Sequence, residues 1–160
     1  METAQLPRDA APEAVQPAKW PVLTVIAIGA AIGAVGRYGV DVLLPAGERG
    51  FPLGTFLVNV VGCLLIGALA GVLCQPAAHP LLRPFMAVGL LGGFTTFSTY
   101  TVEAVTLALG GETATALGYL LATVVAALVA VEAGLVLSRW SAHRRLRTAW
   151  LENRRRGGAP

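Results

Sequence analysis

Five serine and threonine side chains crowd into the seven residues 95–101 of an otherwise apolar stretch: Thr95, Thr96, Ser98, Thr99 and Thr101. Phe97 and Tyr100 lie among them, three residues apart and therefore on one face of a helix. Hydroxyl hydrogens and the positive edges of aromatic rings can together solvate a small anion without a full positive charge. An ion held in this way can also leave, as conduction requires. We interpret this segment as an anion site, with aromatic packing as the alternative.

Two glycines, Gly92 and Gly93, come shortly before this segment and make it a poor helix interior. The segment falls near the middle of a long apolar stretch. A helix break at membrane depth exposes backbone groups that lipid cannot satisfy, so it is tolerated only inside protein, beside a wet cavity or at an ion. The sequence therefore predicts a functional break here, in preference to a simple kink.

Other polar residues interrupt the apolar stretches. Asn59 could face a pore or serve as a contact between helices, and the sequence leaves both open. Arg37 is the only basic residue well inside an apolar block; it is a functional candidate, unless it extends to the interface or pairs with Asp41. Glu103 and Glu132 could lie at a pore mouth or make polar contacts within a bundle.

Several classes of function are disfavoured. Cys63 and Cys74 have neither metal-ligand nor disulfide spacing, and His79 and His143 lie far apart in polar stretches. The sequence contains no glycine-rich phosphate loop and no nucleophile elbow, so we do not expect an enzyme. The net charge of +3 comes largely from arginines beside an apolar block, which favours a membrane surface over nucleic acid.

The elements that must position these residues are long apolar helices. Of the 160 residues, 55% are hydrophobic and 13% charged, and the mean hydropathy is +0.66. We predict an all-α membrane protein with four transmembrane helices, over about 20–44, 52–74, 81–109 and 112–140. Residues 1–19 are expected to be a disordered tail, 20–140 the membrane domain, and 141–160 a basic cytoplasmic tail, in which a helix could continue as far as Trp150.

The spacing of glycines predicts where helices pack closely, and the distribution of charge predicts the orientation in the membrane. Gly29 with Gly33, and Gly67 with Gly71, have the spacing that lets helix backbones approach closely. With four spans, both termini and the loop between the second and third spans share one side. Arg8, Lys19, Arg83 and the C-terminal arginines fall there, so the positive-inside rule places both termini in the cytoplasm.

Three motifs, in this order and spacing, resemble the Fluc (CrcB-type) family of small fluoride channels. They are G-A-V-G-R-Y at 33–38, G-T-F-L-V-N at 54–59 followed by Gly62, and G-G-F-T-T-F-S-T-Y at 92–100. The resemblance covers about residues 20–140, and its third motif is close to diagnostic.

The resemblance implies an antiparallel dimer with two pores. Its pore and fluoride-binding residues would be Asn59, Phe97, Ser98, Thr99, Tyr100, Tyr119 and Arg37. The break would hold a structural Na⁺ at the dimer interface, bound by the backbone carbonyls of Gly92 and Thr95 from each subunit. Tyr100 departs from the family pattern, in which phenylalanine is usual, so conduction rate or ion preference could differ.

The implied function is passive export of fluoride across the plasma membrane by a multi-pass protein. The strong charge bias favours pairing with an oppositely oriented paralogous subunit over a homodimer, and both stay open. The alternatives are a small multidrug-type transporter and a membrane anchor subunit. The transporter would need a central carboxylate, where this chain has Arg37.

Overall fold

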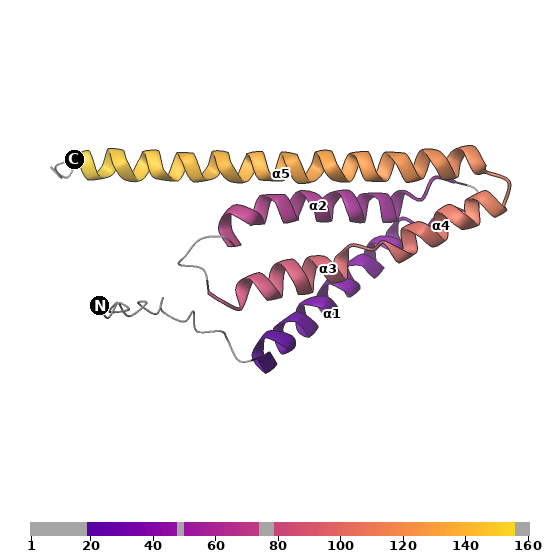
Figure 1. Cartoon of the computed structure of the whole chain (residues 1–160), viewed down its shortest axis with the longest axis horizontal. Helices are drawn as coiled ribbons and strands as arrows, with labels where there is room; N and C mark the ends of the chain where they lie inside the picture. Colours follow the sequence, from indigo (N-terminus) through magenta and orange to yellow (C-terminus); the bar gives the residue numbers. More distant parts are fainter. Residues whose placement is uncertain (1–18, 48–49, 74–78, 156–160) are drawn as a thin grey trace, which may run out of the picture.

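The computed structural model describes residues 19–47, 50–73 and 79–155, and every regular element among them is a helix (Figure 1). The elements are α1 (Lys19–Leu43), α2 (Leu53–Leu73), the π-helix η1 (Pro84–Leu90), α3 (Leu91–Phe94), α4 (Ser98–Leu109) and α5 (Thr113–Arg155). The expected N-terminal tail lies outside the described residues except for Lys19, which begins α1.

Four helical segments are long and apolar enough to cross a membrane, which confirms the predicted number of spans. They are Lys19–Leu43, Leu53–Ala70, Pro84–Leu109 and Thr113–Ser141. Large apolar side chains such as Leu43, Leu109 and Leu121 point outward on these spans. Such a surface suits lipid or another protein rather than water.

The helices pack as two pairs joined by α4. α2 runs along α5, α1 crosses η1 and α3, and α4 lies against α5 (Figure 1). Glycines make both crossings possible: a Cβ on Gly33 would overlap the Leu90 carbonyl oxygen, and one on Gly67 would overlap that of Val131. Gly29 is likewise packed on η1, so three of the four predicted glycines lie at helix crossings. The surroundings of Gly71 are not described.

The third span is interrupted where the sequence predicted. α3 ends at Phe94, Thr95 is extended with φ −74° and ψ 157°, and helical structure resumes at Ser98. The span also begins differently from expectation, because Pro84 to Leu90 form a π-helix, a wider turn that is often found at functional sites.

The fourth predicted helix is longer than expected. It runs without interruption through position 140 to Arg155, so residues 141–155 of the expected tail are helical. Residues 156–160 lie outside the described part of the chain.

Candidate functional site

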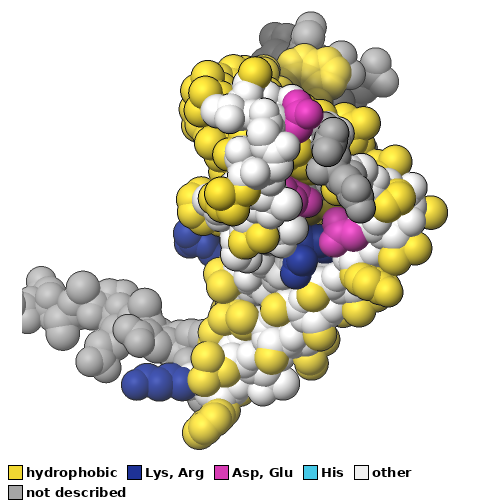
Figure 2. Space-filling model, turned by 90° about the vertical axis from the view of Figure 1, so that its right-hand side faces the viewer, with side chains coloured by type: hydrophobic (Ala, Val, Ile, Leu, Met, Phe, Trp, Pro, Cys, Tyr) yellow, Lys and Arg dark blue, Asp and Glu magenta, His cyan; other side chains and the backbone are white. Residues whose placement is uncertain are grey.

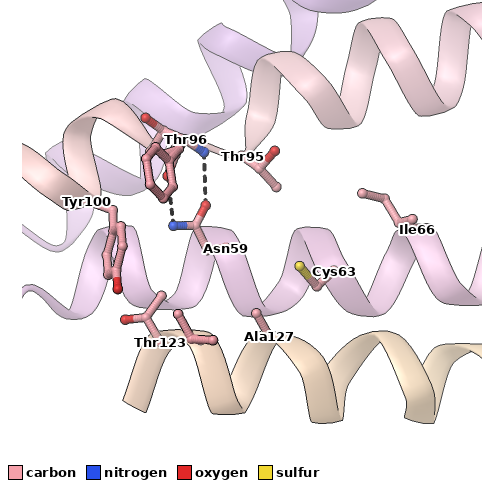
Figure 3. Close-up of a pocket in the computed structure, with 10 residues that line it drawn as sticks. Asn59, Cys63, Ile66, Thr95, Thr96, Tyr100, Thr123 and Ala127 are labelled. Atoms are coloured by element: carbon pink, nitrogen blue, oxygen red, sulfur yellow. Dashed lines mark hydrogen bonds between the residues drawn. The ribbon is translucent and has the colours of Figure 1, made fainter. Parts of the chain in front are cut away.

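Asn59 of α2 holds the break in place. Its Nδ2 donates to the Thr96 carbonyl oxygen and its Oδ1 accepts from the Thr96 N–H, both at 2.9 Å (Figure 3). One amide thus satisfies the two backbone groups that the break frees from the helical ladder. The contact between helices, one of the two roles left open by the sequence, is therefore present. The amide nitrogen keeps a second hydrogen for another acceptor.

Most hydroxyls of the 95–101 segment bond locally. Thr95 Oγ1 donates to the Leu91 carbonyl at 2.9 Å and thereby closes the end of α3. Thr96 Oγ1 accepts from the Thr99 N–H at 3.1 Å and donates to Thr99 Oγ1 at 2.9 Å, which starts α4. Thr101 Oγ1 donates back to the Phe97 carbonyl. The break thus uses more of these hydroxyls than the sequence suggested. Ser98 is exposed, and its Oγ lies 3.4 Å from Thr96 Oγ1.

The two aromatic residues differ sharply in environment. Phe97 is 76% exposed at the break, whereas Tyr100 is 6% exposed on α4. Their ring centroids are 5.8 Å apart and tilted by 50°. Tyr100 O–H donates to the Leu120 carbonyl of α5 at 2.8 Å, and its ring meets that of Tyr119 edge-on at 5.2 Å. The extra hydroxyl of Tyr100 therefore ties α4 to α5.

Glu103 joins three helices. Its Oε1 accepts from Thr55 Oγ1 of α2 at 2.9 Å, and its Oε2 accepts from Tyr119 O–H of α5 at 2.8 Å. Tyr119 is fully buried. Of the two roles considered for Glu103, the polar contact within the bundle is present, and Glu103 also lines a hollow of about 300 Å³ together with Asp41. Glu132 is exposed on α5.

Acidic side chains gather at one end of the molecule. Figure 2 views the end where α1 and α4 finish: acidic side chains and one basic group lie between the helices, hydrophobic side chains cover most of the outside, and other basic side chains stand at its edge. Arg37 donates from Nε to the Gly93 carbonyl at 3.4 Å, in place of the suggested ion pair with Asp41. It therefore contacts the last turn before the break, where helix carbonyls lack partners.

A cavity of about 260 Å³ lies beside the break, between α2, α4 and α5 (Figure 3). It is lined by Asn59, Cys63, Ile66, Thr95, Thr96, Phe97, Tyr100, Thr123, Val124 and Ala127. Three of the predicted fluoride-binding residues, Asn59, Phe97 and Tyr100, therefore meet at one cavity, together with Thr95 of the predicted sodium site. Ser98, Thr99, Tyr119 and Arg37 do not line it.

Thr123 is the residue that sequence analysis missed. It is 4% exposed, and its Oγ1 is buried without a hydrogen-bond partner in the described part of the chain. An unpaired buried hydroxyl is costly unless water or a ligand satisfies it. The available signal was its spacing, because Thr123 follows Tyr119 by one helical turn and so shares its face.

The sequence profile of the family described as "CrcB-like protein, Camphor Resistance (CrcB)" matches residues 24–135. A protein of Paracoccus denitrificans named fluoride-specific ion channel FluC is 49% identical over 114 residues, which cover 71% of this chain and 91% of the relative.

Two further relatives cover a larger share of this chain. Fluoride-specific ion channel FluC 2 of Nocardia farcinica is 46% identical over 132 residues, covering 82% of this chain and 94% of the relative. Fluoride-specific ion channel FluC 1 of Streptomyces coelicolor is 46% identical over 128 residues, covering 79% and 80%. The profile match spans most of the membrane-crossing part of the chain, and the relatives align over most of their own length. The chain belongs to the CrcB-like family of membrane proteins.

Proposed function

We propose that this chain is a subunit of a fluoride-specific channel that lets the ion leave the cell passively. The observation that carries the proposal is the cavity beside the break in the third span, where Asn59, Thr123 and the Phe97 ring converge. The names of the relatives support fluoride as the ion. Fluoride that enters as neutral HF dissociates at cytoplasmic pH, and the trapped anion then moves down its electrochemical gradient. No chemical step is required.

In this proposal the groups that contact the ion are weak hydrogen-bond donors, and none of them carries a full positive charge. The second N–H of Asn59, the unpaired Thr123 hydroxyl and the edge of the Phe97 ring would replace part of the hydration shell. Ser98 and Thr99, at the start of α4, lie outside this cavity and would extend the polar path of the ion beyond it. The hydroxyls of Tyr100 and Tyr119 already donate to Leu120 and Glu103, and Arg37 Nε donates to Gly93. These three residues would therefore support the site without donating these hydrogen bonds to the ion.

The working unit in this proposal is an antiparallel dimer. Its support is the exposure of Phe97 and Gly92 beside the break, which a second subunit would cover. A structural Na⁺ between the subunits would be held by the Gly92 and Thr95 carbonyls, because hard cations favour oxygen ligands. The extended Thr95 backbone takes its carbonyl out of the helical direction, which fits such a use.

The distribution of basic residues supports an orientation in the membrane and a partner subunit. Both termini lie in the cytoplasm in this proposal, because the arginines of the C-terminal region would be costly to translocate. The same bias favours an oppositely oriented paralogous subunit over a second copy of this chain. The multidrug-type transporter lacks support, since Glu103 is held by Thr55 and Tyr119 at one end of the bundle. An anchor subunit would not need the break.

Fluoride efflux from liposomes tests the proposal. Purified protein, alone or co-expressed with a paralogous subunit if silent alone, is expected to release trapped fluoride but not chloride. Phe97→Ile removes the ring edge but keeps an apolar side chain of similar volume, so assembly should survive while efflux falls at least tenfold. A normally assembled Phe97→Ile channel with the parental rate would mean that Phe97 is not an ion contact. Absence of flux from both assemblies would favour the anchor role.

A further inference from the structure

α5 is much longer than a membrane is thick. It runs from Thr113 to Arg155, about 64 Å at a rise of ~1.5 Å per residue, against a hydrocarbon core of ~30 Å. The apolar part that can span ends at Ser141. Residues 142–155 continue in the same direction for about 21 Å, and this end of α5 stands beyond the neighbouring helices (Figure 1).

This extension is strongly basic. Residues 142–155 contain five arginines, Arg144, Arg145, Arg147, Arg154 and Arg155, and one acidic residue, Glu152. The loop at the other end of α5 carries Glu112 and no basic residue. The positive charge is therefore concentrated where α5 leaves the membrane on the side shared with the start of α1 (Figure 1).

Two tryptophans mark the level of the membrane boundary. Trp20, at the start of α1, is 79% exposed, and Trp140 of α5 is 52% exposed. Tryptophan side chains concentrate at the headgroup level of membranes. With four spans, the start of the first and the end of the fourth share one side, and Trp140 directly precedes the last residue of the apolar part of α5.

Because α5 stays straight, its arginines fall into two groups. Arg144, Arg145 and Arg147, the proximal arginines, lie about 5–9 Å along the axis past Ser141, a distance comparable to the headgroup layer of roughly 5–8 Å. Arg154 and Arg155, the distal arginines, lie about 20 Å past it. That is more than twice the Debye length of ~8 Å at physiological ionic strength.

We propose that the proximal arginines form a binding surface for anionic phospholipid headgroups at the cytoplasmic boundary, and that the distal arginines take no part in it. Guanidinium groups bind phosphate oxygens through paired hydrogen bonds, which suits the phosphodiester of a lipid. Each arginine near an anionic surface contributes about a fivefold preference. The surface would resist displacement of α5 along the membrane normal, independently of which ion the channel conducts.

The test measures lipid retained by the purified full-length protein. Protein in mixed micelles with equal phosphatidylglycerol and phosphatidylcholine is analysed for co-purifying phospholipid by native mass spectrometry. The parental chain is expected to retain phosphatidylglycerol preferentially. Arg144→Gln with Arg145→Gln should lower that preference more than tenfold, whereas the matched control, Arg154→Gln with Arg155→Gln, removes the same charge and should change it less than twofold.

Three results would overturn the proposal. One is a parental protein with no preference for phosphatidylglycerol, which would point to a soluble acidic partner for the extension. Another is equal loss in the two double variants, which would mean that the extension lies flat on the surface. The last is a proximal double variant that retains its preference. Circular dichroism of each variant checks that helix content is unchanged. Fluoride efflux in phosphatidylcholine liposomes tests the channel separately.

Discussion

The two halves of the third span are held in the bundle by different means. η1 and α3, before the break, pack backbone to backbone on α1: a Cβ on Gly93 would overlap the Ala30 carbonyl oxygen, and one on Gly89 would crowd that of Ile26. α4, after the break, packs through side chains. Its Tyr100 contacts Tyr119 and its Glu103 accepts from Thr55 and Tyr119.

Because of this difference, the half before the break is rigid, and the half after the break has room for polar groups that face a cavity. Backbone packing through glycine leaves no room for adjustment, because interiors are dense and a displaced helix axis must move as a whole. Side-chain packing leaves space where polar groups can face a cavity, and the cavity beside the break includes Tyr100 but no residue of η1 or α3. Asn59 is the link, since it bonds to Thr96 between the two halves.

The largest effect is expected from Gly93→Ala. The added methyl group meets the backbone of Ala30, which cannot rotate away, so α3 and α1 must separate. We expect little folded protein after solubilisation, measured as the fraction that remains monodisperse in size-exclusion chromatography after heating.

The matched control for Gly93→Ala is Gly118→Ala on α5, where nothing lies within 4 Å of the new Cβ. Alanine is a better helix former than glycine by about 1 kcal/mol, so this control should be as stable as the parent or more so. If Gly93→Ala survives heating as well as Gly118→Ala does, the backbone packing of the first half is looser than described.

An intermediate effect is expected from Asn59→Ala. It leaves the N–H and carbonyl of Thr96 without their partner, at a cost of about 1–3 kcal/mol for each unsatisfied group. The melting temperature in detergent should fall by several degrees and fluoride efflux should drop with it. Cys63→Ala, one turn later on the same cavity, is the control and should change both much less. Equal effects of the two variants would refute a linking role for Asn59.

The smallest effect is expected from Tyr100→Phe. The ring and its edge-on contact with Tyr119 remain, and only the hydrogen bond to Leu120 is lost, about 0.5–1.5 kcal/mol. Efflux should stay within twofold of the parent, in contrast to Phe97→Ile. A folded Tyr100→Phe channel that no longer conducts fluoride would show that this hydroxyl contacts the ion and does not merely join α4 to α5.

Sequence analysis was most successful where one residue type has one physical consequence. Paired glycines followed by threonines in an apolar stretch predicted the break, and α3 ends within that motif. Gly29, Gly33 and Gly67 were correctly interpreted as packing positions. The π-helix at 84–90 was not predicted, because nothing in this apolar segment separates π from α hydrogen bonding. The continuation of α5 to Arg155 was underestimated, because arginine favours both solvent exposure and helix.

The residue types along the chain were sufficient for the four spans, the break and the family, because hydropathy and backbone propensity are local properties. The residue types did not predict the hydrogen-bond partners of the polar side chains, because those partners depend on which helices meet. Asn59 bonding to Thr96, Arg37 turning to Gly93 instead of Asp41, and the unpaired Thr123 hydroxyl all follow from helix crossings. The unequal burial of Phe97 and Tyr100 has the same origin. Three residues apart along the chain, they differ because α5 packs over one of them and leaves the other exposed.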